Sequence, residues 1–179
     1  MRRVRAAVAT LALLIAACSG PPVNRDPSIP LTTATNVDLG QYAGFWYEIA
    51  RFPNSFEKNC VGSTAQYVKN RDGSIKVLNR CRKLKLDGDQ DVVEGRARVI
   101  SDGKLAVTFF WPFEGDYWIL QVADDYTWAL VGEPSGRYLW ILAREPQIDP
   151  ALKDSLTRKL KALGYNTDAL YWTPQPPKK

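Results

Sequence analysis

The chain has 179 residues and a mass of 20.1 kDa, which predicts a single folded domain. Apolar residues make up 45% of it and charged residues 24%, a balance that excludes intrinsic disorder, collagen and coiled coil as descriptions of the whole chain. The sequence contains no histidine, which excludes Ser-His and Cys-His catalytic pairs and removes the commonest zinc ligand. The formal net charge is +5.

The first seventeen residues form a predicted signal peptide. Three arginines among the first five residues precede an apolar run at 6–17, which is too short to span a bilayer as a helix. The run ends in Ala16-Ala17-Cys18, which resembles the lipobox of bacterial lipoproteins. In such proteins the cysteine receives a diacylglycerol, becomes the N-terminus after cleavage and is acylated on its amine by a chain such as palmitate. The alternative is an ordinary signal peptide with a chance cysteine.

Cleavage before Cys18 changes the expectations for the mature chain. It removes three arginines and no acid, so the formal charge falls from +5 to +2 and predicts no nucleic-acid partner. Ser19 favours the outer over the inner membrane by analogy with enteric sorting rules, and the protein would there face the periplasm. Residues 19–37 are rich in Pro, Thr, Ser and Asn, and predict a flexible tether between the lipid and a folded domain at 38–173. The Pro- and Lys-rich tail at 174–179 predicts disorder.

The folded domain contains eight strand-like runs at the spacing typical of a β-sandwich or barrel. The runs lie at 44–52, 61–69, 74–82, 91–100, 104–110, 116–123, 126–132 and 137–144. A helix is predicted next, because Asp149 is a good N-cap, Pro150 fits the first helical position and Gly164 ends the pattern. Its leucines form one apolar stripe, which predicts packing against the sheet rather than a partner site. A last short strand is expected within 169–172.

Cys60 and Cys81 are the cysteines that remain after Cys18. An even pair in an exported chain favours a disulfide, and the alternative is two separate buried thiols. If the runs at 61–69 and 74–82 pair around the turn at 70–73, both cysteines lie at the end of that hairpin away from the turn. A disulfide there is geometrically reasonable.

Three short motifs in order resemble the conserved regions of the lipocalins. They are Gly44-Phe45-Trp46 at the start of the first run, Asp125-Tyr126 before the seventh, and Arg144 at the end of the eighth. With Cys18, the pattern is similar to that of the bacterial outer-membrane branch of the family. The resemblance implies an all-β fold, an eight-stranded antiparallel up-and-down barrel with the helix packed outside. It also implies that Trp46 plugs one end with Arg144 across its ring, and that the other end opens as a ligand cup.

Alternation along the strands, together with this resemblance, predicts which side chains line the cup. The expected lining is Tyr138, Trp140, Leu142, Tyr117, Ile119, Gln121, Ala65, Tyr67 and Val77, with Trp111 and Phe113 at the mouth. Ser63, Ile75 and Asn79 share the expected inward face. The parity of Trp46 also points Glu48 inward, where a carboxylate needs a partner or a raised pKa. The alternative is that these aromatic residues fill a solid core and the barrel holds nothing.

These observations favour a binding protein that needs no cofactor, no metal and no covalent step. The expected ligand is a small hydrophobic molecule such as a fatty acid or a lysophospholipid, bound by a monomer or weak dimer on the membrane. One alternative is an enzyme using Glu48, Tyr117 and Tyr138, and another is a structural lipoprotein with a filled barrel. The paired acids at 87–89 and 124–125 are expected to be turn residues.

A basic stretch surrounds Cys81. It consists of Arg80, Arg82, Lys83 and Lys85. These side chains predict either a solvated edge or a rim that holds an anionic headgroup.

Overall fold

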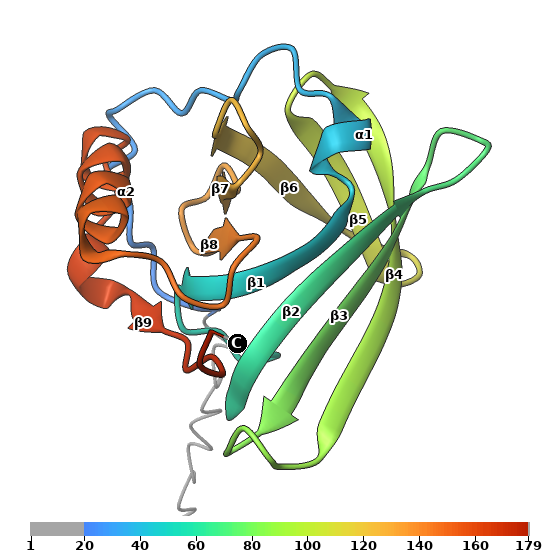
Figure 1. Cartoon of the computed structure of the whole chain (residues 1–179). Helices are drawn as coiled ribbons and strands as arrows, with labels where there is room; N and C mark the ends of the chain where they lie inside the picture. Colours follow the sequence, from blue (N-terminus) through green and yellow to red (C-terminus); the bar gives the residue numbers. More distant parts are fainter. Residues whose placement is uncertain (1–19, 179) are drawn as a thin grey trace, which may run out of the picture.

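Figure 1 shows the computed structural model of the chain, which describes residues 20–178. The predicted signal peptide and Cys18 lie outside the described residues. Eight strands follow one another up and down: β1 (Gly44–Arg51), β2 (Cys60–Lys69), β3 (Ile75–Lys83), β4 (Gln90–Ser101), β5 (Lys104–Phe110), β6 (Phe113–Val122), β7 (Trp128–Gly132) and β8 (Leu139–Ala143). Each pairs antiparallel with the next, and β1 pairs with both β2 and β8. The sheet therefore closes, and the predicted eight-stranded barrel is confirmed.

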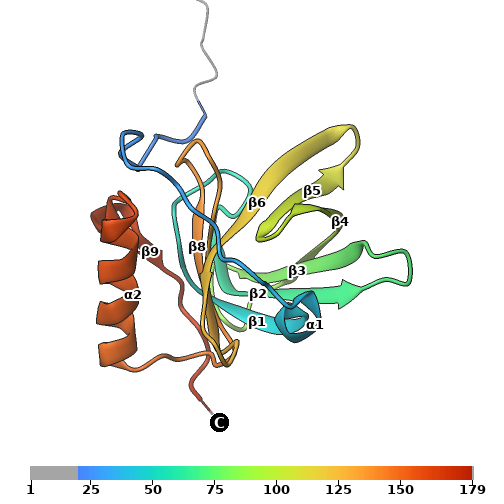
Figure 2. The ribbon, with the colours of Figure 1, turned by 90° about the horizontal axis from the view of Figure 1, so that it is seen from above.

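The predicted helix is α2 (Pro150–Ala162), and it packs on the outside of the barrel (Figure 2). The Asp149 carboxylate accepts a hydrogen bond of 2.8 Å from the Leu152 N–H, which satisfies one free donor of the first turn. Leu156 and Leu160 are fully buried against the outer faces of β1, β7 and β8. The leucine stripe is thus part of a second hydrophobic core between helix and barrel.

Alternate turns define the two ends of the barrel. The closed end carries the short helix α1 (Leu39–Tyr42) and the β2–β3, β4–β5 and β6–β7 turns. The open end carries the β1–β2, β3–β4, β5–β6 and β7–β8 connections. This assignment follows from the antiparallel order of the strands alone.

The N-terminal segment at 20–37 is not the flexible tether that its composition predicts. It runs along the outside of the barrel from the open end to the closed end (Figures 1 and 2). At the open end the Asn24 N–H donates to the Gly136 carbonyl at 2.9 Å, and Arg25 lies against Tyr165. At the closed end the Asp102 carboxylate accepts from the N–H groups of residues 36 and 37. The segment is ordered because its backbone groups find partners on the barrel.

Gly136 explains how the segment approaches the β7–β8 turn so closely. Its φ of +71° is in the region that favours glycine, and a Cβ there would lie 2.5 Å from Cβ of Arg25. Any other residue at position 136 would push the N-terminal segment away from the barrel.

After η1 (Thr167–Ala169), the two-residue strand β9 (Tyr171–Trp172) pairs with the end of β1, and it confirms the short strand expected within 169–172. The tail from residue 174, for which disorder is predicted, contacts the barrel through Pro174 and Gln175. Beyond Tyr47 the register leaves β1 unpaired with β2. The tail fills this gap, since the Thr173 N–H donates to the Ile49 carbonyl at 3.0 Å and the Gly62 N–H donates to the Pro174 carbonyl at 2.7 Å. Among residues 20–178, no helix is both long and apolar enough to cross a membrane.

Candidate ligand-binding site

The closed end of the barrel is plugged by Trp46 and Arg144. Trp46 is fully buried, and its indole N–H donates to the Tyr42 carbonyl at 2.8 Å. The Arg144 guanidinium lies 3.7 Å from the centroid of the Trp46 ring and also donates to the Phe45 carbonyl at 2.7 Å. Gly44 permits this approach, because its φ is +96° and a Cβ there would lie 3.4 Å from Nη1 of Arg144. The pair therefore belongs to the core and not to a binding surface.

The second lipocalin-like motif, Asp125-Tyr126, also stabilises the closed end. The Asp125 carboxylate accepts hydrogen bonds from the N–H and hydroxyl of Thr127, which is the turn role expected for it. The Tyr126 hydroxyl accepts from the Asp38 N–H at 2.8 Å and so joins the β6–β7 turn to the start of α1. Both side chains therefore hold neighbouring backbone segments in place through hydrogen bonds to N–H groups.

Above the plug, three tyrosines fill the closed half of the barrel. The Tyr117 hydroxyl lies 2.7 Å from that of Tyr42 and 2.9 Å from that of Tyr67. Burial raises the pKa of each phenol well above its ordinary value, so all three stay neutral. The cavity between these rings and Val107 measures about 10 Å³, which is the space of a single water. The closed half therefore has no room for an acyl chain.

The open half of the barrel is lined differently. Trp140 and Tyr138 of the β8 side stack with ring centroids 6.0 Å apart, and Tyr138 also contacts Phe56 of the β1–β2 connection. On the β6 wall, Gly115 shares the inward parity of Tyr117, and a Cβ built there meets no atom within 4 Å. A side chain at position 115 would therefore have free space on the inward side of β6.

Two of the buried polar atoms that have no hydrogen-bond partner within the described residues lie on neighbouring strands of the barrel wall. They are Oγ of Ser63 and Oδ1 of Asn79, on the inward faces of the neighbouring strands β2 and β3. Ser63 is 4% exposed. A buried polar atom without a partner carries a desolvation cost that a polar ligand group would remove.

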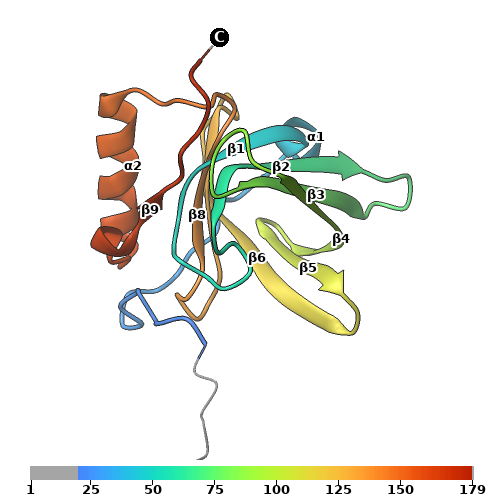
Figure 3. The same ribbon diagram turned by 90° about the horizontal axis from the view of Figure 1, so that it is seen from below.

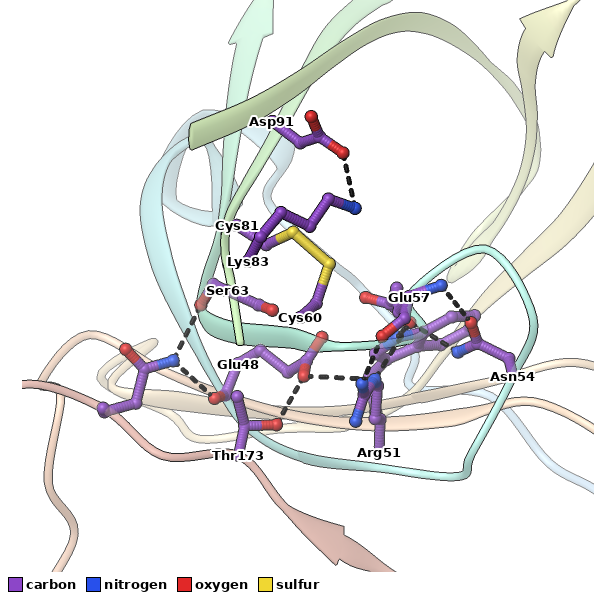
Figure 4. Close-up of a disulfide and its surroundings, with 12 residues drawn as sticks. Glu48, Arg51, Asn54, Glu57, Cys60, Ser63, Cys81, Lys83, Asp91 and Thr173 are labelled. Atoms are coloured by element: carbon purple, nitrogen blue, oxygen red, sulfur yellow. Dashed lines mark hydrogen bonds and ion pairs between the residues drawn. A yellow bond between two sulfur atoms is a disulfide. The ribbon is translucent and has the colours of Figure 1, made fainter. Parts of the chain in front are cut away.

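Glu48 does point inward as its parity predicts, and it has partners (Figure 4). Nε of Arg51 lies 3.6 Å from Oε1 of Glu48 and 3.4 Å from Oε2 of Glu57, so one guanidinium separates two carboxylates. The Thr173 hydroxyl donates to Glu48. Burial, followed by the charge of Glu57, raises the pKa of Glu48 well above its usual range, and Arg51 only partly opposes this.

This cluster joins the tail to the barrel wall. The Gln175 amide donates to the carbonyls of Glu48 and Ser63, both at 2.8 Å, and so bridges the gap between β1 and β2. Glu57 accepts a bond of 3.2 Å from the Trp140 indole. The polar cluster therefore fixes one side of the cup and the orientation of Trp140.

The disulfide predicted between Cys60 and Cys81 is present at the open end, with Cα atoms 5.4 Å apart (Figure 4). Beside it Nζ of Lys83 lies 2.5 Å from Asp91, and both share the inward parity of Cys81. The rest of the basic stretch is on the outer face or in the β3–β4 turn. Arg80 bonds Gln66, Arg82 bonds the Gly88 carbonyl, and Lys85 pairs with Asp87. Of the four basic residues in the stretch, Lys83 alone faces the cup.

The expected lining residues fall into four groups. Leu142, Ile119, Ala65, Tyr67, Val77, Ile75 and Tyr117 belong to the interior core, mostly in the filled closed half. Trp140 and Tyr138 line the open half, and Trp111 and Phe113 lie at the mouth, 88% and 75% exposed. The prediction that Gln121 lines the cup is wrong. A bulge between Ile119 and Gln121 reverses the alternation of inward and outward side chains, and Val122 packs inward instead.

Residues that the sequence did not single out complete the cup. Phe109 of β5 lies across Gly95 of β4, where a Cβ would be 2.6 Å from its ring. Gly115 and Arg51 were also missed. Gly95 and Gly115 belong to no recognisable sequence motif, and only the strand register shows that they face the barrel interior.

The residues of the enzyme alternative have separate partners. Tyr117 is bonded to two tyrosines, Tyr138 is stacked on Trp140, and Glu48 is bonded to Thr173. Within residues 20–178, no hydrogen bond joins these three side chains, and no group of three or more acids and cysteines is placed to hold a metal ion.

Comparisons with known proteins show that this chain is a member of a known family. A family model described as a lipocalin-like domain matches residues 37–175. The chain is 36% identical over 173 residues to the outer membrane lipoprotein Blc of Citrobacter freundii, with 95% of each chain covered. It is 38% identical over 151 residues to temperature-induced lipocalin-1 of Arabidopsis thaliana, with 78% of this chain and 80% of that one covered.

Solved structures agree on the fold. Insecticyanin from the tobacco hornworm Manduca sexta matches with a TM-score of 0.67 at 19% identity, covering 82% of this chain and 85% of that chain. The allergen Per a 4 from cockroaches matches with a TM-score of 0.65 at 23% identity, covering 84% and 97%. At these identities the likeness concerns the barrel alone.

Proposed function

Because the chain belongs to the lipocalin family, we propose that it binds single-chain lipids, such as fatty acids or lysophospholipids, in the open half of its barrel. The observation that carries the proposal is that the open half holds free space at Gly115 together with the stacked rings of Tyr138 and Trp140. A concave site of aromatic walls with a few polar atoms suits an elongated apolar ligand that has one polar end.

The binding energy would come from burial of the chain, at about 25 cal/mol per Å² of apolar surface removed from water. The acyl chain would lie against Trp140 and Phe109. The Ser63 hydroxyl would donate to an ester or carboxylate oxygen of the ligand, and Oδ1 of Asn79 would accept from a ligand hydroxyl. Lys83 at the mouth would face an anionic head. No covalent step is needed, so the protein stores or carries its ligand unchanged.

The proposed location is the periplasmic face of the outer membrane, with acyl chains on Cys18 as the anchor. The signal-like run that ends in Ala16-Ala17-Cys18 supports this, and so does the similarity to proteins named outer membrane lipoprotein Blc. Three acyl chains exceed the two signals that stable anchoring needs.

Native mass spectrometry of residues 19–179, purified without detergent and then extracted for lipid, tests the binding proposal. A bound species with the mass of a fatty acid or lysophospholipid is the expected result. A protein that is empty and that fails to bind these lipids on titration would contradict it.

A pair of variants on β6 links the binding to the cup. Gly115→Phe fills the open space, and we expect it to weaken lipid binding at least about tenfold, since a ring would occupy the volume of the chain. Asp116→Leu is the matched control, because the next residue on the strand faces outward and is exposed. Equal affinities for both variants would place the ligand elsewhere.

A further inference from the structure

Five large apolar side chains are exposed on three of the open-end connections. They are Phe56, Leu84, Phe110, Trp111 and Phe113, with exposed fractions from 61% to 88%, and we call them the open-end rim. Three of them sit at the tip of the β5–β6 hairpin, around the Trp111-Pro112 bond. At the closed end the exposed apolar residues, such as Phe45 and Val68, reach only 41–50%. The three hairpin residues Phe110, Trp111 and Phe113 are close in sequence, and an exposed apolar cluster of this kind marks an interaction surface.

The described chain begins at the same end. The Arg137 guanidinium in the β7–β8 connection donates to the Pro21 carbonyl, and Asn24 bonds Gly136 of that turn. Figures 2 and 3 place the start of the described chain and the tip of the β5–β6 hairpin toward one edge of the molecule. Both the rim and the point where the chain joins the barrel therefore lie at the mouth of the cup.

The length of chain before this point is short. Cys18 precedes Pro21 by three residues, which span at most about 10 Å when fully extended. If residues 19–37 formed a flexible tether, the barrel would be free to turn in any direction. Because the segment is instead bonded to the barrel from Pro21 and Asn24 onward, an anchor at Cys18 would hold the open end against the bilayer.

We propose that the open-end rim docks on the phospholipid surface that holds the acyl chains of Cys18, with Trp111 and its neighbours in the headgroup region and the mouth of the cup facing the membrane. Aromatic rings are favoured at this depth because they are apolar over most of their surface and polar at one edge. This inference rests on the proposed anchoring at Cys18. It adds an orientation in which a single-chain lipid passes between bilayer and cup without crossing open water.

Trp111 itself reports the docking. The mature lipidated protein is reconstituted in phosphatidylcholine vesicles whose acyl chains are brominated near the headgroup, and its emission is compared with that of Trp111→Phe. The difference is the emission of Trp111. We expect that emission to fall roughly twofold in brominated against plain vesicles. The matched control is Val68→Trp in the Trp111→Phe background, which introduces an indole at the closed end whose emission should not change.

The outcomes separate the docking from the anchoring. If the protein floats with the vesicles, carries acyl chains by intact mass, and Trp111 is not quenched, the anchoring stands and the docking is wrong. The docking is also wrong if Trp111 and the indole introduced at position 68 are quenched to the same extent. It is wrong as well if a second copy of the chain, and not the membrane, covers Trp111. A protein that carries no acyl chain and does not float would overturn the anchoring and this orientation with it.

Discussion

The closed and open halves of the barrel differ in how completely their interiors are packed. In the closed half, Trp46 is fully buried under Arg144 and three tyrosine hydroxyls bond one another around a cavity of about 10 Å³. In the open half, a Cβ at Gly115 meets nothing within 4 Å, and Oγ of Ser63 has no partner within the described residues. Stability is concentrated where packing is complete, and the capacity to bind is concentrated where it is not.

Truncation of the plug should therefore have the largest effect. We expect Trp46→Ala to lower the free energy of unfolding by about 3–5 kcal/mol, since it removes a fully buried indole from a site that cannot collapse. Urea denaturation followed by circular dichroism measures it. Trp111→Ala is the matched control, because that ring is 88% exposed, and its change should stay within about 0.5 kcal/mol. Comparable losses for the two tryptophans would mean that the closed half is not the stabilising half.

The disulfide should matter next, and it stabilises the open half. Replacing Cys60 and Cys81 together with alanine opens a loop with a sequence separation of 21, and we expect a loss of about 2–4 kcal/mol. Denaturation of the double variant, compared with wild type under oxidising and reducing conditions, checks this. A double variant as stable as the oxidised wild type would show that the tail and the strand pairs suffice to hold the open end.

Glu48 makes the polar wall of the cup sensitive to pH. Burial raises its pKa in the folded protein above the ordinary value of 4.5, so the folded state holds a proton that the unfolded chain has lost. Stability is then full below about pH 4.5 and falls as the pH rises through the folded pKa, by at most about 1.4 kcal/mol per pH unit. We expect Glu48→Gln to remove this slope, as measured by urea denaturation between about pH 5 and pH 8. An unchanged slope in the variant would assign the titration to another group.

The sequence predicts the regular parts of this fold well. The eight runs, the Asp149 cap and the leucine stripe follow periodicities that one strand or helix imposes on its own residues. The Cys60–Cys81 bond follows from the same hairpin register. The resemblance to the lipocalins implies the plug, and the structure shows the expected contact between Arg144 and the Trp46 ring.

The features that escape prediction depend on contacts between distant segments. A single bulge after Ile119 reverses the parity of Gln121, and no local pattern marks it. The composition of 20–37 and of the tail indicates disorder. In the structure, however, Asn24 and Gln175 donate to backbone carbonyls of the barrel, those of Gly136 and Glu48. These carbonyls come within reach only when the barrel has folded. Glycines that face the barrel interior, such as Gly115, carry no sequence signal either, because their position depends on the strand register.

The most direct test of the division between the two halves is quenching by a fatty acid brominated along its chain. Wild type is compared with Trp140→Phe, which loses the indole of the open half, and with Trp128→Phe, whose indole lies on the outer face of the barrel near α2. We predict saturable quenching with about one ligand per chain that is largely lost in Trp140→Phe and fully kept in Trp128→Phe. Quenching that persists unchanged in Trp140→Phe would contradict a ligand in the open half of the barrel.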